Sequence, residues 1–170
     1  AGLRAAEYAL GASYTPLPAD PTEYARQQFD AIRSSRGEEK AFTIGNEMKA
    51  VMFDDVGVFR TEQGMQRALD KVRELRQRLL HVRTPDPGKV FNTELINTWE
   101  LGNLLELAEM TTVSAMVRQE SRGGHAREDF PKRDDVNWLK HTLAWMDKNG
   151  VRLGYKPVTI TKYQPKERVY

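Results

Sequence analysis

The sequence predicts a mainly α fold: an antiparallel three-helix bundle, with N-terminal helices before it and a C-terminal β-hairpin plus an extended tail after it. Residues 22–84 and 88–130 contain no proline, and long helices belong there because proline is the strongest helix breaker. Apolar residues in the first stretch recur at three- and four-residue steps, the period of one helix face, and those in the second leave little polar face. An Asn-Gly pair at residues 149–150 indicates a hairpin.

Two short helices are expected before the bundle. Residues 1–11 read as a helix, and the proline-rich residues 14–21 as a linker. Asp20 is interpreted as the N-cap of the second helix, because Pro21 would then take the first helical position and Glu23 would complete a capping box.

Three longer helices make up the predicted bundle, arranged up, down and up as in a spectrin repeat. A loop at residues 34–40 leads to the first helix, residues 43–56. The second covers residues 61–82, with Thr61 as its N-cap, and prolines end it. The third covers residues 93–121 and is apolar nearly all round, so we expect it to be the central helix, buried against several neighbours.

The last part of the chain changes character. A charged loop follows Gly123, and β-prone residues 141–147 and 151–160 flank the Asn-Gly turn. A two-stranded hairpin is marginal alone, so it must pack on the bundle or on something else. Residues 162–170 read as extended.

These elements suggest three parts. Residues 1–36 hold the N-terminal helix and a linker helix, residues 37–122 the three-helix bundle, and residues 123–170 the charged loop, hairpin and tail. If the chain normally packs on a larger partner, we expect residues 1–11 and 141–158 to expose apolar surface and to be loosely held.

Composition excludes several classes of protein. The 170 residues contain no cysteine, which rules out disulfides, thiolate metal sites and a cysteine nucleophile. No apolar run is long enough to span a bilayer, and residues 1–11 lack the layout of a signal peptide. The chain begins at Ala1 without an initiator methionine, which fits either processing or excision from a longer protein.

Charge is distributed unevenly along the chain. Residues 1–117 carry 14 basic and 17 acidic residues, a balance of −3, whereas residues 118–170 carry 12 and 7, a balance of +5. The basic residues of the second part alternate with acids and show no aromatic stacking pattern, so we expect no nucleic-acid partner.

Motifs for catalysis and for metal binding are missing. The histidines His81, His125 and His141 form no HExxH or His-x-His pair, so no metal site is expected. No glycine-rich phosphate loop and no GxSxG nucleophile elbow occurs. The third bundle helix carries acidic residues without paired Glu-x-x-His motifs, so they should be solvated or ion-paired with Arg67, Arg73 or Arg76. These acids are Glu94, Glu100, Glu106 and Glu109.

A polar cluster at residues 118–129 is the one candidate functional loop. It combines a helix end, two glycines, a histidine, three arginines and three acids. The residues singled out are Arg118, Glu120, Ser121, Arg122, Gly123, His125, Arg127, Glu128 and Asp129. Two interpretations are open, a docking or active-site loop and a structural loop held together by Arg–carboxylate bonds; the physical chemistry alone favours the second.

The same loop carries a family resemblance. Residues 120–142, ESRGGHAREDFPKRDDVNWLKHT, are similar to the segment after the last long helix in flavoprotein subunits of succinate dehydrogenase and quinol:fumarate reductase. Residues 92–119 resemble the last helix of their C-terminal three-helix bundle, and the closing YKPV and YQPKERVY resemble their C-terminus. Residues 1–11 look like the helix that closes the preceding flavin-binding domain. L-Aspartate oxidase, an alternative parent, usually lacks the ARED…RDD…WLKHT continuation.

The resemblance implies a parent enzyme that passes a hydride between succinate and a covalently attached FAD, then electrons to an iron–sulfur subunit and quinone. Its partners would be the flavin-binding and capping domains of the same subunit, the iron–sulfur subunit and, indirectly, a membrane anchor. It would lie at the cytoplasmic side of the bacterial inner membrane or the matrix side of the mitochondrial one, the fragment itself being soluble.

The family's catalytic and flavin-attachment residues lie before the matched region. We therefore expect this chain to hold no catalytic, cofactor-binding or metal-binding residue, and to be inactive alone. Its role would be structural or docking. A stand-alone helical interaction module is the alternative, since fold alone does not fix function.

Overall fold

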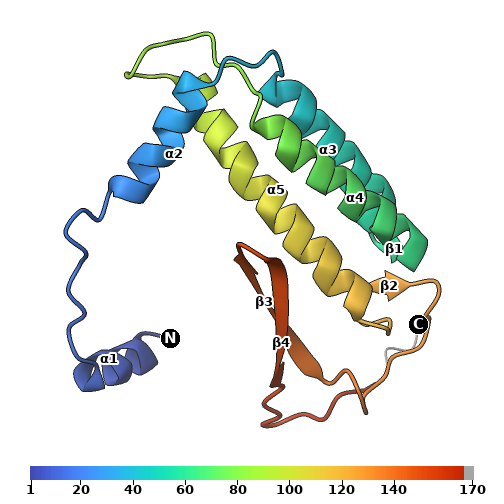
Figure 1. Ribbon diagram of the computed structural model, residues 1–170. Coiled ribbons are helices and arrows are strands. Elements are labelled where there is room, and N and C mark those ends of the chain that lie inside the picture. Colours follow the sequence, from blue (N-terminus) through green and yellow to red (C-terminus); the bar gives the residue numbers. More distant parts are fainter. Residues whose placement is uncertain (167–170) are drawn as a thin grey trace.

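The computed structural model describes residues 1–166, and the predicted fold class is confirmed (Figure 1). In chain order the elements are α1 (Gly2–Gly11), α2 (Glu23–Ser34), α3 (Ala41–Val56), β1 (Phe59–Arg60), α4 (Glu62–Leu79), α5 (Thr93–Val117), β2 (Ala126–Arg127), β3 (Lys140–Asp147) and β4 (Gly150–Pro157). None of the described helices is long and apolar enough to cross a bilayer.

Helices α3, α4 and α5 pack against one another and form the bundle (Figure 1). The apolar stripes that the sequence places on these helices meet in the core. The larger core cluster consists of Ile44, Met48, Val72, Leu75, Val82, Leu101, Leu105 and Ala108. A smaller cluster, at the end of the bundle where α4 begins, consists of Val56, Met65, Ala68 and Ala115. The Thr61 side chain accepts a hydrogen bond from the Gly64 N–H at 3.1 Å, so the predicted N-cap of α4 is confirmed.

Helix α4 ends three residues earlier than predicted. Its last residue is Leu79, and Val82 forms a parallel bridge with Glu39 instead of continuing the helix. The Glu39 N–H donates to the His81 carbonyl at 3.1 Å, and the Arg83 N–H donates to the Glu39 carbonyl at 3.0 Å. This pairing with the segment before α3 satisfies backbone groups that a longer helix would have used.

Helix α5 is the central element, with contacts to α2, α3, α4 and the hairpin. It begins after Asn92, whose side chain accepts from the Leu95 N–H at 2.9 Å. The prediction placed its end near residue 121, but it ends at Val117 because Arg118 has extended backbone. These contacts agree with the expectation of a central helix buried against several neighbours, but they do not cover all of its apolar surface. Several apolar side chains on it are exposed, namely Ile96, Leu104, Leu107 and Val117.

The two N-terminal helices stand apart from the core. Every residue of α1 is exposed, and α2 packs on α5 through the Phe29 and Trp99 rings, whose centroids lie 5.4 Å apart. The predicted capping box at Asp20 is wrong: α2 begins at Glu23 with Thr22 as N-cap. The Asp20 carboxylate instead accepts from the Thr22 N–H at 3.1 Å and closes a turn upstream of the helix.

The sequence did not predict the smaller of the two sheets. Strands β1 and β2 are two residues each and pair in parallel, with Phe59 opposite Ala126 and Arg60 opposite Arg127. This pairing attaches the loop after α5 to the segment between α3 and α4. It therefore fixes the loop to the end of the bundle at which α4 begins (Figure 1).

The predicted hairpin is confirmed in strands β3 and β4, which are joined at Lys148–Asn149. Gly150 has φ 104°, a conformation that glycine adopts at low cost. Residues of β3 alternate between half-buried and exposed, because one face of the hairpin covers α5. The second strand stops at Pro157, so the prediction for residues 158–160 is wrong. Residues 158–166 form no helix or strand, and the remainder of the predicted tail, residues 167–170, lies outside the described residues.

Candidate functional site

The predicted loop begins where α5 ends and passes through β2 before it reaches the hairpin. It therefore lies among the end of α5, the start of α4 and the first residues of β3 (Figure 1). Two of its charged side chains, Glu120 and Arg127, are among the most buried in the described chain, at 0% and 1% exposure. Because burying a charge is costly unless it is paired, the partners of these two residues determine what the loop does.

Glu120 is a fully buried carboxylate with four donors. Arg122 donates to it through Nε at 2.8 Å and Nη2 at 2.9 Å, and Arg118 donates through Nη1 at 2.5 Å. The Asp134 N–H supplies the fourth bond at 2.9 Å. Burial alone would raise the pKa of Glu120, but the bonds from Arg122, the Asp134 N–H and Arg118 outweigh it and hold the pKa below its usual range. Glu120 is therefore ionised and unavailable as a proton donor near neutral pH.

Arg127 is a buried guanidinium that connects two helix ends. It donates through Nη1 to the Met116 carbonyl at 2.7 Å and to the Ala115 carbonyl at 3.2 Å, where α5 leaves carbonyls without helical partners. It also forms a two-bond pair with Asp129, at 2.6 and 2.8 Å. The other Asp129 contact is the Glu62 N–H at 2.8 Å, at the start of α4. Arg127 and Asp129 thus link the C-terminal end of α5 to the N-terminal end of α4, and we call this pair the helix clamp.

The pKa of Asp129 is lowered to about 2. The bond from Arg127 is the main cause and outweighs burial, which would raise the pKa; the bond from the Glu62 N–H lowers it further. The helix clamp is therefore charged on both sides throughout the physiological pH range.

Ser121 and the glycines shape the backbone of the loop. The Ser121 hydroxyl accepts from the Arg127 N–H at 2.8 Å and donates to the Phe130 carbonyl at 2.9 Å. Residues 122–125 form a tight turn closed by two backbone bonds between Arg122 and His125. Gly123 occupies that turn with φ 61°, which a residue with a side chain adopts only at some cost.

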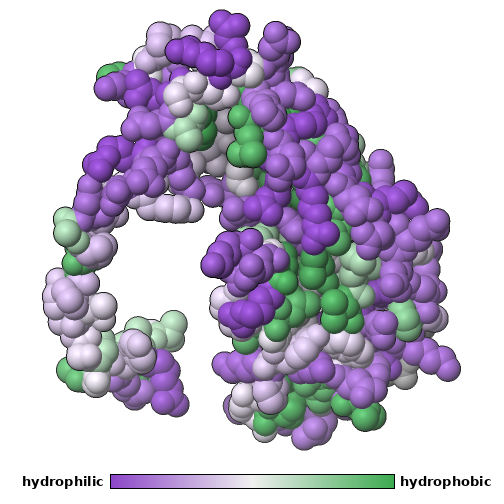
Figure 2. Space-filling model, viewed as in Figure 1, coloured by the Kyte–Doolittle hydropathy of each residue, from purple (hydrophilic) through white to green (hydrophobic). Residues whose placement is uncertain are grey.

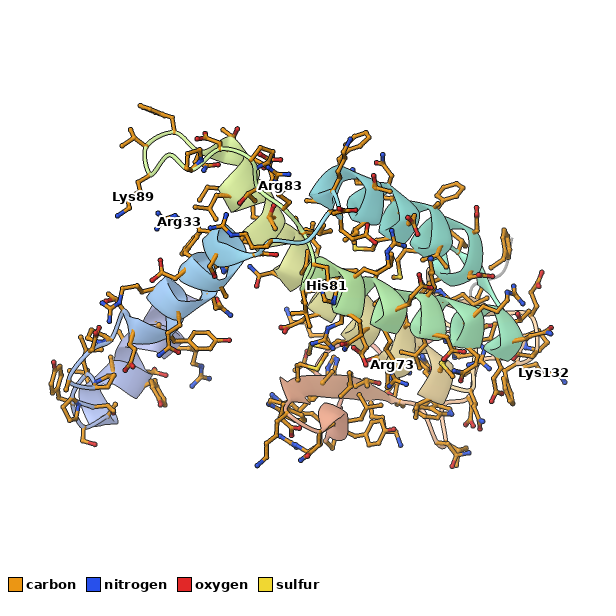
Figure 3. The ribbon with its side chains drawn as sticks, turned by 45° about the horizontal axis from the view of Figure 1, so that its top comes forward. Arg33, Arg73, His81, Arg83, Lys89 and Lys132 are labelled. Atoms are coloured by element: carbon orange, nitrogen blue, oxygen red, sulfur yellow. The ribbon has the colours of Figure 1, made fainter. Side chains whose placement is uncertain are left out.

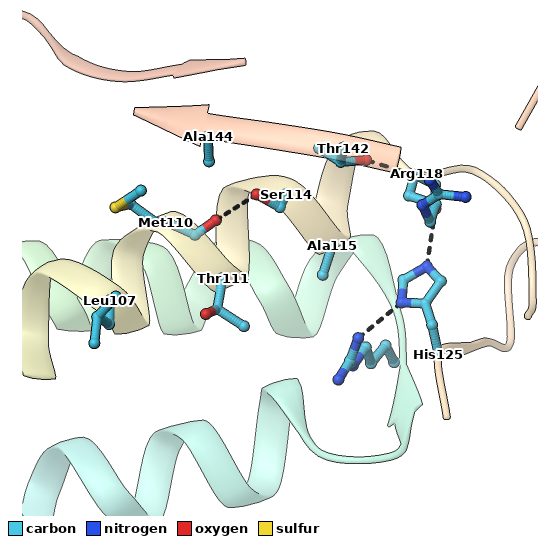
Figure 4. A pocket seen from close by; sticks show the side chains of 10 residues that line it. Leu107, Met110, Thr111, Ser114, Ala115, Arg118, His125, Thr142 and Ala144 are labelled. Atoms are coloured by element: carbon cyan, nitrogen blue, oxygen red, sulfur yellow. Dashed lines mark hydrogen bonds between the residues drawn. The ribbon is translucent and has the colours of Figure 1, made fainter. Parts of the chain in front are cut away.

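His125 is held as the neutral tautomer. Its Nδ1 lies 2.7 Å from Arg60 Nη1, and because arginine only donates, Nδ1 must accept. Its Nε2 lies 3.0 Å from the Arg118 carbonyl oxygen, which only accepts, so Nε2 carries the proton. Figure 4 shows the ring held between these two contacts. Burial lowers the pKa of His125, and the nearby positive charges of Arg60, Arg127 and Arg118 lower it further, against the bond to the Arg118 carbonyl. Both ring nitrogens are occupied, so this geometry gives His125 no free lone pair for base catalysis.

Arg118 connects the loop to the hairpin. Besides Glu120, it donates to the Trp138 carbonyl at 3.0 Å, to the Lys140 carbonyl and to the Thr142 hydroxyl at 3.3 Å. Its guanidinium also lies over the Trp138 ring, 5.2 Å from the centroid. Since β3 begins at Lys140, these bonds fix the start of the hairpin against the end of α5.

An open groove of about 430 Å³ runs between α5 and β3 beside the loop (Figure 4). Leu107, Met110 and Ala144 form its apolar walls, and Arg60, Arg118 and His125 form its polar end. None of the carboxylates in the described chain lines it. It is the most conspicuous surface feature next to the predicted loop.

Chemistry elsewhere in the described chain is structural. Glu109, 2% exposed, accepts from Arg73 at 2.9 Å and from Arg76, as the sequence suggested for the acids of this helix; Figure 3 shows Arg73 on α4. Arg67 pairs with Asp55 instead, at 2.5 Å. In residues 1–166 no three His, Cys, Asp or Glu side chains come together as metal ligands would.

The residues predicted from the sequence fall into three groups in the structure. Seven of them share one hydrogen-bonded network: Arg118, Glu120, Ser121, Arg122, His125, Arg127 and Asp129. Gly123 forms the exposed turn, and the exposed Glu128 contributes its backbone N–H to the Arg60 carbonyl at 2.9 Å. Sequence reasoning missed Arg60, which lies 65 positions before His125, and Asp134 and Asp135, which hold Glu120 and Arg122. The sequence shows the run Arg133-Asp134-Asp135, but it does not show which residues of the loop these side chains and backbone groups contact.

Comparison with known proteins identifies the architecture. The family model described as "Fumarate reductase flavoprotein C-term" matches residues 45–170. The 8-methylmenaquinol:fumarate reductase flavoprotein subunit of Wolinella succinogenes is 40% identical over 175 residues, which cover 100% of this chain and 28% of that protein. The succinate dehydrogenase flavoprotein subunit of Rickettsia bellii is 37% identical, and the match covers 100% of this chain and 30% of that protein.

A solved structure agrees with the sequence relatives. The chain superposes on Escherichia coli quinol fumarate reductase FrdA with a TM-score of 0.87 at 42% identity, covering 99% of this chain and 30% of that one. The chain thus spans less than a third of the length of these relatives.

Proposed function

The chain belongs to the family of fumarate reductase flavoprotein C-terminal domains, and from that membership we propose that it is the C-terminal portion of a flavoprotein subunit that interconverts succinate and fumarate. Relatives named for fumarate reductase and for succinate dehydrogenase both match. The proposal therefore covers both directions of the reaction, succinate oxidation and fumarate reduction. In this proposal the chain is a structural and docking element, and a stand-alone helical module is the weaker alternative because the chain aligns inside much longer relatives.

One observation carries the structural role: the buried charges of the predicted loop are neutralised within the chain. Glu120 is surrounded by Arg118, Arg122 and a backbone N–H, and Arg127 by Asp129 and the carbonyls of α5. A catalytic acid or base needs a free proton site or lone pair facing a substrate. This loop uses its buried charged groups, Glu120 and Arg127, to join the two helix ends and the hairpin.

The described residues do not fit a flavin dinucleotide. Binding its pyrophosphate requires a glycine-rich turn before a helix N-terminus, usually within a βαβ unit. The Gly123 turn instead follows a helix, closes on itself through backbone bonds and leads into β2. In the proposed parent subunit, a covalently attached FAD would accept or donate the hydride, held by the preceding flavin-binding domain.

We propose the partners that this role requires. The flavin-binding and capping domains of the same subunit and the iron–sulfur subunit would contact this chain, with the membrane anchor reached only through them. The parent would then lie at the membrane surface as a peripheral subunit. Residues 1–36 would connect to the flavin-binding domain, residues 37–122 would form the brace, and residues 123–170 would carry the docking loop and hairpin.

Flavin binding by the chain alone tests this division of labour. We expect FAD fluorescence to remain unquenched when the chain is titrated to micromolar concentrations, because no described residues cradle a pyrophosphate. An apoprotein that binds FAD without a covalent bond serves as the positive control. Micromolar quenching by the chain would contradict the proposal.

Co-expression with the flavin-binding portion of a related subunit supplies the positive test. We expect the chain to co-purify with that portion and to raise its succinate-dependent dye reduction. Glu120→Ala, which removes the carboxylate shared by Arg118 and Arg122 and leaves Arg122 with Asp135, should lower both readouts. If the flavin-binding portion is equally active and stable without the chain, a structural role is wrong.

A further inference from the structure

One face of α5 is left without a partner beside the hairpin. Leu104, Leu107, Thr111 and Ser114 follow one another at steps of three and four residues, so they share a face of the helix, and Arg118 follows at its C-terminal end. Leu104 is 48% exposed and Leu107 57%. Figure 2 shows apolar surface over this part of α5, next to the hairpin, and the groove between α5 and β3 continues it toward the loop.

The polar end of this groove holds a positive charge without a counter-ion. Arg60 donates through Nε to the Gly57 carbonyl at 2.6 Å and to the Val56 carbonyl at 3.2 Å, and through Nη1 to His125. All of these acceptors are neutral. Within the described residues, Nη2 of Arg60 makes no hydrogen bond and no carboxylate pairs with this guanidinium.

Arg127 lies in a position comparable to that of Arg60 but has a carboxylate partner. Arg60 and Arg127 are opposite each other in the β1–β2 pair, and each places its guanidinium at the C-terminal end of a helix, α3 for Arg60 and α5 for Arg127. Arg127 is matched by the carboxylate of Asp129. Arg60 also contacts helix-end carbonyls, through Nε where Arg127 uses Nη1, but its side-chain partner is His125 and not a carboxylate.

We propose that the groove between α5 and β3 is a docking site for an acidic segment of a partner polypeptide, which places an aspartate or glutamate carboxylate on Arg60 and apolar side chains along α5. This rests on the proposed function and names the chemistry of what docks. Positive charge at one end and the absence of carboxylates from the described lining make the groove complementary to an acidic ligand. The carboxylate would take the free Nη2 of Arg60.

The shape of the surface favours a polypeptide over a small anion. The face from Leu104 to Ser114 covers 10 residue steps of α5, about 15 Å at the rise of an α-helix, and Arg118 follows at the helix end. A small anion at Arg60 would leave Leu104 and Leu107 in water. A segment with an apolar residue on either side of the acid would cover them and also desolvate the ion pair, which strengthens it.

Two matched peptides test the proposal, acetyl-Leu-Ala-Asp-Leu-amide and acetyl-Leu-Ala-Asn-Leu-amide, each added to the isotope-labelled chain and followed by NMR. We expect the aspartate peptide to shift the backbone signals of Leu107, His125 and Thr142, with the asparagine peptide about fivefold weaker, as one ion pair at a partly exposed site provides. Arg60→Gln should remove this preference. Arg60→Lys should retain part of it and controls for loss of fold. Arg152→Gln, at an exposed arginine stacked on Trp145, should leave it unchanged.

Three results would overturn the proposal. Equal binding of the two peptides, or no shift by either at about 10 mM, would show that the groove does not select a carboxylate. A preference for the aspartate peptide that survives Arg60→Gln would show that the ligand carboxylate binds at a residue other than Arg60. The same shifts with succinate alone would make the groove a small-anion site. None of these depends on flavin binding, so this test and that of the proposed function fail independently.

Discussion

Two clusters of arginines and carboxylates in this chain have similar chemistry and different surroundings. Toward the end of the bundle at which α4 ends, Arg78 pairs with Glu39, Glu47 and Glu74 at 2.7 to 3.3 Å, and its side chain is 26% exposed. In the helix clamp, Arg127 pairs with Asp129 at 2.6 Å and its side chain is 0% exposed. Each cluster has one carboxylate whose pKa is lowered to about 2, Glu47 in the first and Asp129 in the second.

The comparison shows that the pKa of a carboxylate does not measure its structural importance. Neutralising Glu47 leaves Arg78 with Glu39, Glu74 and access to water. Neutralising Asp129 leaves a fully buried guanidinium with carbonyl partners and, at 3.9 Å, the exposed carboxylate of Glu62. We therefore expect burial of the arginine to decide the cost, because exposed ion pairs contribute little and unpaired buried charges cost several kcal/mol.

Glu120→Ala is expected to have the largest effect, since two arginines and the Asp134 N–H lose their common acceptor. We expect unfolding in urea to show a loss of about 3–5 kcal/mol. Glu120→Gln keeps the volume and one acceptor oxygen, so its loss should be smaller. If Glu120→Ala costs no more than an exposed ion pair, burial is not what distinguishes the clusters.

Asp129→Asn should come next, at about 2 kcal/mol, because the buried Arg127 loses its only charged partner within hydrogen-bond distance while the bond to the Glu62 N–H can persist. Urea unfolding at neutral pH measures it. High salt should change this value less than that of an exposed pair, because the Arg127 side chain is fully buried although that of Asp129 is 30% exposed. At 1 M salt the Debye length is about 3 Å. A loss of stability that disappears under this condition would show that solvent ions screen the pair.

Acid should erase the difference between the native chain and Asp129→Asn. The folded pKa is about 2, below the ordinary 3.8 of the unfolded chain, so the carboxylate stabilises the fold above pH 3.8 and this stabilisation is lost as the pH falls toward 2. Urea midpoints of the two proteins measured between pH 5 and pH 2 should converge. Constant separation across that range would assign the effect of Asp129→Asn to shape, not charge.

Glu47→Gln should have the smallest effect, below about 1 kcal/mol, in spite of its equally low pKa. We expect added salt to reduce it further, because the cluster around Arg78 is partly exposed. Asp129→Asn is the matched comparison, measured in the same buffers. An equal cost for the two variants would refute the argument from burial.

The elements that sequence reasoning found are those that local signals specify. The apolar spacing of α3 and α4, the Thr61 cap and the Asn-Gly turn depend on residues close together in the chain. The ends of α4 and α5 were wrong because distant partners set them. Glu39 pairs with the residues after α4, and Arg127 takes the carbonyls at the end of α5. Strands of two residues, such as β1 and β2, have no detectable period.

The sequence was enough to recognise the candidate site as a dense polar loop, but the role of each charged residue depends on which partner it contacts. The sequence shows three arginines and three acids between residues 118 and 129 and does not say which are buried. Glu120 and Arg127 have nothing in their immediate neighbours that marks them as fully buried. Arg60 lies in a segment that only the β1–β2 pairing brings to His125.

The same parallel pairing has a consequence for the order of folding. It joins residues 59–60 to residues 126–127, and the entropy of closing so long a loop must be overcome before the contact contributes. The helices between them form from local contacts and can assemble first. We therefore expect the helix clamp to form after the transition state for folding, so that its variants speed unfolding and leave the folding rate nearly unchanged. In that case the clamp determines how long the native chain stays folded, not how quickly it gets there.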